Sequence, residues 1–285
     1  MPKLLNYNPS NHYIAVLGYP GSGKSVFITS FIKHIISEKI PGYRAKKIEK
    51  ETAKRLKDDI KCLNSGTPLD PARTEPIFPY IVDISKGKLA LKKYIKVQIG
   101  DFSDDNRAQF NEGYRQWFHK APSFVWAMQA DAFVFVVDLA EVLAQYDDDF
   151  YCKKVSDGIY EAWKSIEKSH LGGAKKLKNN AIVLLFSKAD LLKTFHELLG
   201  PKPQGQMRIK MLQSGFSKKL LPVTTNIKKD LDADLYALIE EKFADIIHYL
   251  KRRSNRFNII YFSHFLTINN LPIGIEKVAD SILPK

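Results

Sequence analysis

The chain has 285 residues, of which 45% are hydrophobic, and a formal net charge of +13. Its length allows one large α/β domain with a substantial core, and no apolar run approaches the roughly 18 residues of a membrane-spanning helix. Only two cysteines are present, which argues against a disulfide framework and a cysteine-based metal site. Residues 1–6 do not read as a signal peptide. We therefore expect one cytoplasmic domain over residues 1–285, without a transmembrane segment.

The first predicted element is a short buried strand at residues 13–17, which leads into the segment GYPGSGKS at residues 18–25 and then into a helix that ends before Pro41. A strand, this glycine-rich spacing and a helix together predict a phosphate-binding loop. Glycines let the backbone N–H groups turn inward around phosphates, and the helix N-terminus adds donors. We expect Lys24 to reach the terminal phosphates and the Ser25 hydroxyl to bind Mg²⁺. The candidate phosphate-binding residues are Gly18, Pro20, Gly21, Ser22, Gly23, Lys24 and Ser25.

A strongly basic segment comes next. Residues 44–61 hold eight Lys or Arg against four Asp or Glu, and their apolar residues follow the spacing of a helix. We expect a basic helix here, within a helical insertion at about residues 43–76. Its charge predicts an acidic partner or an anionic surface. Nucleic acid is a less favoured partner, because no aromatic residues are interleaved to stack on bases.

The remaining elements alternate between strands and helices. Helical patterns occupy residues 155–166 and 231–250, and a short connection at 85–88 makes the second and third strands an antiparallel hairpin. Strands are expected at residues 78–84, 89–99, 132–137, 181–186 and 258–262. The prediction is an α/β fold with a mostly parallel six-stranded sheet and helices on both faces. Ligands of such sheets bind at the carboxyl ends of the strands.

Several of these strand ends carry polar residues. Asp101 follows the third strand, where it can hold Mg²⁺ through a water molecule, and Asp138 follows the fourth strand, where it can do the same. The fifth strand ends in Ser187-Lys188-Ala-Asp190, and the sixth in Ser263-His264.

The Asp190 carboxylate can accept hydrogen bonds from N1–H and the exocyclic amine of guanine, whereas adenine offers an acceptor at N1. Loss of two such bonds predicts discrimination of about 10³-fold. The aliphatic stem of Lys188 would cover the face of the base.

The order of these motifs resembles the P-loop GTPases of the translation-factor-related class, and the resemblance covers nearly the whole chain. It implies a P-loop GTPase fold with GTP or GDP and Mg²⁺ as cofactors, Asp101 in the second sphere of Mg²⁺, and Ser263 and the His264 backbone in the base pocket. Residues 18–30 are further similar to the bacterial YcjX-like and double-GTPase families. The residues implied to surround the phosphates and to read guanine are Gly21, Gly23, Lys24, Ser25, Val26, Ser187, Lys188 and Asp190.

In that class, a Thr of the first switch touches Mg²⁺ and the terminal phosphate. Thr74 is the candidate, because it lies six residues before Tyr80 at the entry to the second strand. Thr67 is the reserve candidate, and both residues also suit ordinary turns.

The second switch departs from the expected Asp-x-x-Gly. The chain has Asp104 in place of the glycine, and an aspartate there would repel the terminal phosphate. Asp105 is the candidate for orienting water, and Arg107 or Arg115 for stabilising the transferring phosphoryl group. We expect slow hydrolysis that a partner accelerates.

The resulting hypothesis is a guanine-nucleotide-binding regulatory GTPase with a protein effector. Three alternatives stay open. One is a nucleotide-binding scaffold without turnover, and another is a P-loop ATPase or kinase that uses Asp138 as its magnesium carboxylate. The third is a nucleic-acid or membrane-surface binder that uses residues 44–61.

Overall fold

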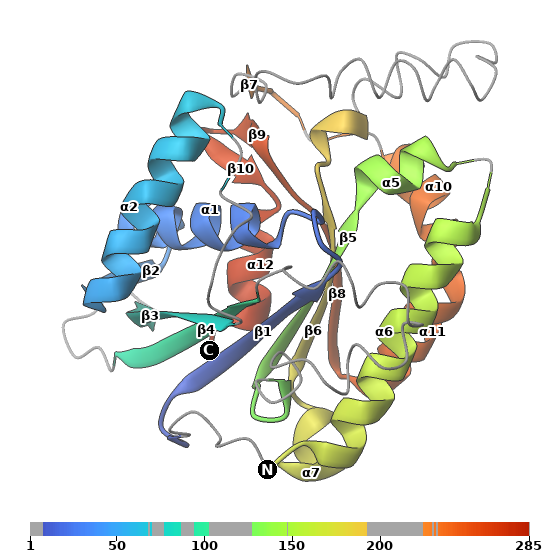
Figure 1. The fold of residues 1–285 in the computed structure, drawn as a ribbon, viewed down its shortest axis with the longest axis horizontal. Coiled ribbons are helices and arrows are strands. Elements are labelled where there is room, and N and C mark those ends of the chain that lie inside the picture. The colour runs from blue at the N-terminus through green and yellow to red at the C-terminus, as the bar shows by residue number, and fades with distance from the viewer. Residues whose placement is uncertain are drawn as a thin grey trace.

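The computed structural model describes residues 8–67, 69, 77–86, 94–102, 127–146, 148–192, 225–229, 231 and 233–284. A central sheet lies between two layers of helices (Figure 1). Alternate residues of β1 (His12–Gly18) enter the two cores: Tyr13, Ala15 and Leu17 pack on one side, and Ile14 and Val16 on the other. A strand that is buried on both faces explains the continuous apolar run of β1.

The central sheet has seven strands in the order β2-β3-β4-β1-β5-β6-β8. From β4 to β8 all neighbours are parallel, whereas β3 is antiparallel to both β4 and β2. The antiparallel second and third predicted strands are thus confirmed, but the count of six strands is wrong. The strands other than β1 are β2 (Tyr43–Ile48), β3 (Ile77–Lys86), β4 (Ile95–Phe102), β5 (Ala132–Asp138), β6 (Ala181–Ser187) and β8 (Arg256–Tyr261).

The extra strand comes from the basic segment. A helix was expected from residue 44, but β2 occupies residues 43–48, and α2 (Lys50–Ser65) begins only afterwards. The helix α2 begins at Lys50 because the Glu49 carboxylate caps it. This carboxylate accepts hydrogen bonds from the backbone N–H groups of Glu51 and Thr52 at 2.9 and 3.0 Å. The exposed Arg44, Lys46 and Lys47 lie on an edge strand, where charge opposes pairing with another chain.

The predicted bounds of the hairpin between the second and third strands are also wrong. Residues 85–88 were expected to connect its two strands, but β3 continues through Ser85 and Lys86, which pair with Arg44 and Tyr43 of β2. The next strand, β4, begins at Ile95 rather than at residue 89. The additional neighbour keeps β3 extended beyond its pairing with β4.

Helices cover both faces of the sheet. α1 and α12 pack on one face, and α6, α10 and α11 on the other (Figure 1). The pattern at residues 231–250 is divided between α10 and α11 at Phe243, whose buried ring contacts Phe186 with centroids 5.2 Å apart. The described helices other than α2 are α1 (Lys24–Ile36), α5 (Leu139–Ala144), α6 (Phe150–Ser169), α7 (Gly173–Leu177), α10 (Ala233–Lys242), α11 (Ala244–Arg253) and α12 (Ile275–Ile282).

A second, three-stranded sheet has the order β10-β9-β7. It comprises β7 (Thr225–Asn226), β9 (Ser263–Ile268) and β10 (Leu271–Ile273). Because β9 begins two residues after β8 ends, the chain passes directly from the central sheet into the second one at Phe262. None of the helices in the described ranges is long and apolar enough to cross a bilayer.

Gly274, at the N-cap of α12, provides a test of this packing. Its φ is +80°, and a Cβ there would lie 2.2 Å from the Tyr261 carbonyl oxygen, whereas Gly42 has a φ of +82° and open space around it. Both Gly→Ala variants incur backbone strain, but only Gly274→Ala also forces the helix away from β8. We expect Gly274→Ala to lower the free energy of unfolding by about 2 kcal/mol more than Gly42→Ala does in urea titrations. Equal losses would contradict the packing described.

Candidate functional site

The glycine-rich loop joins β1 to α1 at the carboxyl edge of the sheet. Gly21 and Gly23 have φ values of +74° and +89°, which glycine adopts without strain. Gly23 is also the N-cap of α1, so the helix begins without a capping side chain at this position. Ser25 and Val26 follow in the first turn of α1, and both are half-buried. The helix N-terminus and the loop together present backbone donors to an anion.

Lys24 is folded back onto this loop. The side chain is 4% exposed, and its ammonium group donates to the carbonyl oxygens of Gly18 and Tyr19 at 3.1 and 2.9 Å. The turn itself is closed by a hydrogen bond from the Ser22 N–H to the Tyr19 carbonyl, across Pro20 and Gly21. A buried cation is thus held within the loop that is predicted to bind phosphate.

Ser187, at the end of β6, ties this loop to the second predicted motif. Its hydroxyl lies 2.6 Å from the Ser22 carbonyl oxygen and 3.1 Å from that of Val137, so it can donate to either. A Cβ on Gly23 would lie only 3.5 Å from the Cβ of Ser187. The glycine-rich loop and the segment at residues 187–190 therefore meet at one edge of the sheet.

Asp190 is held by the chain that follows β8. The Ser263 hydroxyl donates to Asp190 Oδ1 at 2.6 Å and accepts from the backbone N–H groups of Phe265 and Leu266 at 3.1 Å each. The Ala189 N–H donates to the Phe262 carbonyl at 3.0 Å. Burial raises the pKa of Asp190, and the Ser263 hydrogen bond opposes this effect. The carboxylate is thus fixed in place and partly buried, so donors from a ligand would stabilise its charged form.

Lys188 and Asp138 form an ion pair beside Asp190. The Lys188 ammonium lies 2.6 Å from Asp138 Oδ2, and Asp138 Oδ1 accepts the Ala140 N–H at 2.9 Å, capping α5. Both oxygens of Asp138 are thus engaged within the protein. Asp138 therefore links the end of β5 to both Lys188 and the start of α5.

The His264 side chain contacts α1, the helix that follows the glycine-rich loop. It is buried, and its Nδ1 lies 3.0 Å from the Ser30 hydroxyl on α1. Burial, assisted by the positive charge of Lys33, lowers the pKa of His264 to about 4. The contact connects β9 to α1, which sequence reasoning had not found.

His264 gives a prediction for acid stability. Its pKa in the folded protein is about 4, below the ordinary 6.5, so the unfolded chain binds the proton more tightly. Neutral His264 contributes up to about 3 kcal/mol to the free energy of unfolding. This contribution is fully present above pH 6.5 and is lost as the pH falls toward 4. We expect His264→Asn, whose amide can still contact Ser30, to flatten the pH dependence of the unfolding free energy between these values. Parallel curves for the variant and the wild type would contradict this account.

The magnesium and switch residues are placed only in part. Asp101 belongs to β4, where its backbone pairs with Phe78, and β4 lies beside β1; its side chain lies outside what the structure describes. Thr74 and Asp105 also lie outside the described residues, as do Asp104, Arg107 and Arg115. Thr67, the reserve candidate, donates its hydroxyl to the Cys62 carbonyl at 3.2 Å, at the end of α2. Among the residues described, no cluster of three His, Cys, Asp or Glu forms a metal site.

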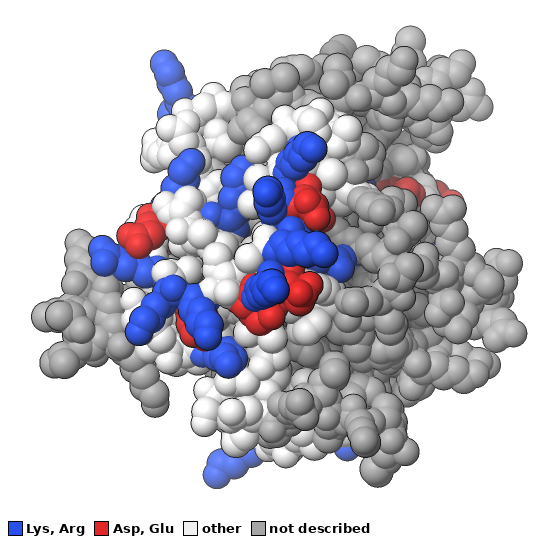
Figure 2. Space-filling model, turned by 60° about the vertical axis from the view of Figure 1, so that its left-hand side comes forward, with Lys and Arg blue, Asp and Glu red and all other residues white. Residues whose placement is uncertain are grey.

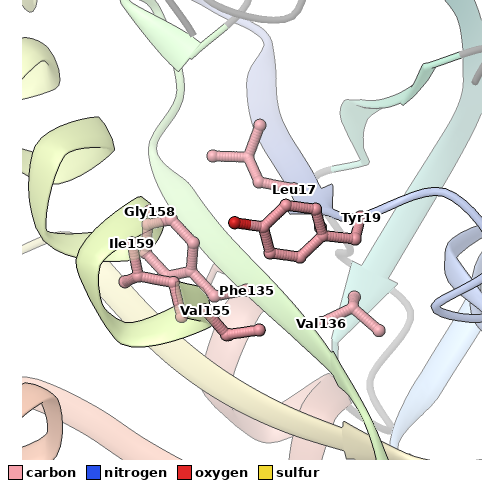
Figure 3. A pocket seen from close by; sticks show the side chains of 8 residues that line it. Leu17, Tyr19, Phe135, Val136, Val155, Gly158 and Ile159 are labelled. Carbon is pink, nitrogen blue, oxygen red and sulfur yellow. The ribbon is translucent and has the colours of Figure 1, made fainter. Parts of the chain in front are cut away.

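A small cavity of about 20 Å³ lies behind the loop, on the side of α6 (Figure 3). Its lining is mostly apolar and includes Leu17, Phe135 and Val155. This volume holds about one water molecule, so the cavity is too small for a nucleotide. Tyr19 also lines it and donates its hydroxyl to the Lys154 carbonyl at 3.3 Å, which attaches the glycine-rich loop to α6.

Neither a protein-family model nor a curated protein matches the sequence. Among solved structures, the chain is similar to Methanosarcina barkeri Roco2 RocCORdC bound to GDP, with 13% identity and a TM-score of 0.33. The match covers 95% of this chain and 47% of the other, so the chain spans about half the length of that protein. Because the identity and the TM-score are both low, this similarity does not assign a function to the site.

Proposed function

We propose that the chain binds GDP and GTP with Mg²⁺ and acts as a regulatory P-loop GTPase of the translation-factor-related class. The observation that carries the proposal is the hydrogen bond from Ser187 to the Ser22 carbonyl. It joins the predicted phosphate loop to the segment that bears Asp190, so one nucleotide can contact both.

The residues present fit such a ligand. Lys24 and the N-terminus of α1 would bind the phosphates, and Asp190, positioned by Ser263, would accept the N1–H and the amine of guanine. Ser25, Thr74 and Asp101 are the proposed residues on the Mg²⁺ side, where the cation would neutralise phosphate charge. The YcjX-like or double-GTPase affiliation belongs to the same proposal.

Hydrolysis is proposed to be slow. Asp104 stands where this class has a glycine that faces the terminal phosphate, and Asp105 is the proposed water-orienting residue. A protein effector would then respond to the bound nucleotide. If single-turnover assays show tight GTP binding without phosphate release, the chain is a binding module rather than a GTPase.

The basic face is a secondary candidate for a partner. Exposed lysines and arginines gather over α2 and β2, with acidic residues between them (Figure 2). An acidic partner or anionic surface is proposed there, and its binding should weaken steeply with salt.

The nucleotide proposal is tested by competition. GTP, GDP and ATP are titrated against a fluorescent guanine nucleotide, with and without Mg²⁺. We expect GDP and GTP to compete and ATP to compete about 10³-fold less well. Equal competition by ATP would favour the ATPase or kinase alternative, and no binding of any nucleotide would refute the proposal.

A further inference from the structure

The ion pair between Asp138 and Lys188 connects the ends of two neighbouring strands. Asp138 is the last residue of β5 and pairs in register with Ser187, the last residue of β6. The ammonium nitrogen lies 2.6 Å from Asp138 Oδ2, and the two side chains are 7% and 30% exposed. Asp138 is therefore fixed in the protein, whereas Lys188 borders the proposed nucleotide site.

Lys188 is restrained at both ends. Its backbone has a φ of +59°, which sets the direction in which the side chain leaves the chain. Its ammonium group is held by Asp138. A lysine stem is otherwise flexible, with four carbons and many rotamers. Because both ends are fixed, the stem of Lys188 can adopt only a limited set of positions. Lys188 lies two residues before Asp190 in the chain.

We propose that Asp138 is a positioning residue for nucleotide binding: it holds the stem of Lys188 in place to cover the face of the purine before the nucleotide arrives. This inference rests on the proposed function. Ordering a flexible side chain during binding lowers affinity, so a stem that is already ordered raises it by about three- to tenfold.

The two oxygens of Asp138 allow this role to be tested separately from the role in α5. Asp138 Oδ1 caps α5 through the Ala140 N–H, and Asp138 Oδ2 holds Lys188. Asp138→Asn keeps an oxygen for the cap but replaces the other with an NH₂ group, which cannot accept from an ammonium. We expect the Kd for GDP to rise about three- to tenfold in this variant.

A double-mutant cycle separates positioning from structural damage. In a Lys188→Ala background, Asp138→Asn should cause no further change in the Kd for GDP, because there is no stem left to position. A purely structural role would produce the same loss in both backgrounds and overturn the inference. If Asp138→Asn does not fold, Lys188→Met, which keeps most of the apolar stem but cannot bind Asp138, should reproduce the loss; unchanged affinity in Lys188→Met would overturn it.

The residue that precedes β5 offers a matched control. Asp131 Oδ2 accepts the Tyr13 N–H at 3.0 Å, and Asp131 Oδ1 pairs with Lys176 at 2.9 Å, at the opposite edge of the sheet. Asp131→Asn removes an equivalent ion pair and should leave the Kd for GDP unchanged; a loss equal to that of Asp138→Asn would overturn the inference. If Asp190→Asn weakens GDP binding and Asp138→Asn does not, only this inference fails. If Asp190→Asn binds GDP as the wild type does, the proposed function fails as well.

Discussion

Replacing Lys24 with methionine is expected to raise the Kd for GDP about 100-fold, because the variant loses the charged donor at the phosphates. Hydrogen bonds to charged groups contribute about 1.5–3 kcal/mol, and 1.4 kcal/mol corresponds to a factor of ten. In the structure, the ammonium group donates to the carbonyl oxygens of Gly18 and Tyr19, inside the loop. We expect the ammonium group to leave these carbonyl oxygens and donate to the phosphates when GDP binds. Isothermal titration calorimetry measures the loss.

Lys33 serves as the control for charge on the same helix. It is half-buried near the end of α1, and its ammonium group donates to Asn64 at 3.3 Å. Lys33→Met removes one positive charge from the helix without touching the loop, so the Kd for GDP should stay near that of the wild type. If Lys24→Met and Lys33→Met bind GDP equally well, Lys24 does not contact the phosphates.

Asp190→Asn is expected to raise the Kd for GDP about 10³-fold. Guanine presents two donors on the edge that would face this residue, and the amide of asparagine presents one acceptor and one donor. The variant therefore loses one of the two hydrogen bonds to guanine, and the amide NH₂ group faces the other guanine donor. Ser263 can still donate to the amide oxygen, so we expect the fold to survive. Thermal unfolding of the variant without ligand checks that expectation.

The pH dependence of binding gives a second signature of Asp190. Burial raises its pKa in the free protein, and donors from guanine would lower that pKa in the complex. The affinity for GDP should therefore be highest above the pKa that Asp190 has in the free protein, and it should decline as the pH falls through that pKa. In Asp190→Asn, this decline of the GDP affinity at acid pH should disappear. An unchanged acid profile in the variant would assign the titration to another group.

The elements around the phosphate loop could be predicted because their signals are local. A buried strand, a glycine-rich turn and a helix follow each other within 25 residues, and the runs of β5 and β6 are continuously apolar. Parallel strands end at one edge of a sheet, so the end of β6 and the loop after β1 share that edge. There the Ser187 hydroxyl donates to the Ser22 carbonyl, a contact that no local pattern predicted.

The basic segment was harder to predict. The apolar stripe of α2 is real, since Thr52, Leu56 and Leu63 are buried, but the helix starts later than the stripe suggested. Glutamate is not among the common N-cap residues, so Glu49 gave a weak signal. The strand character of β2 depends on pairing with β3, which no local pattern reveals.

The contacts missed within the site are long-range. Asp138 and Lys188 are 50 residues apart, and the bond between His264 and Ser30 spans 234 residues. The first can be anticipated once both residues are placed at the ends of neighbouring strands. The second required knowing that the chain leaves the central sheet after β8 and begins β9 beside α1.

The most direct measurement of whether Asp190 reads the base is the ratio of affinities for GDP and xanthosine diphosphate. Xanthine carries a carbonyl oxygen where guanine carries its amine, so it suits an asparagine amide better than a carboxylate. The account predicts that the wild type prefers GDP and that Asp190→Asn prefers xanthosine diphosphate, measured by competition under identical conditions. The same preference for GDP in both proteins would contradict it.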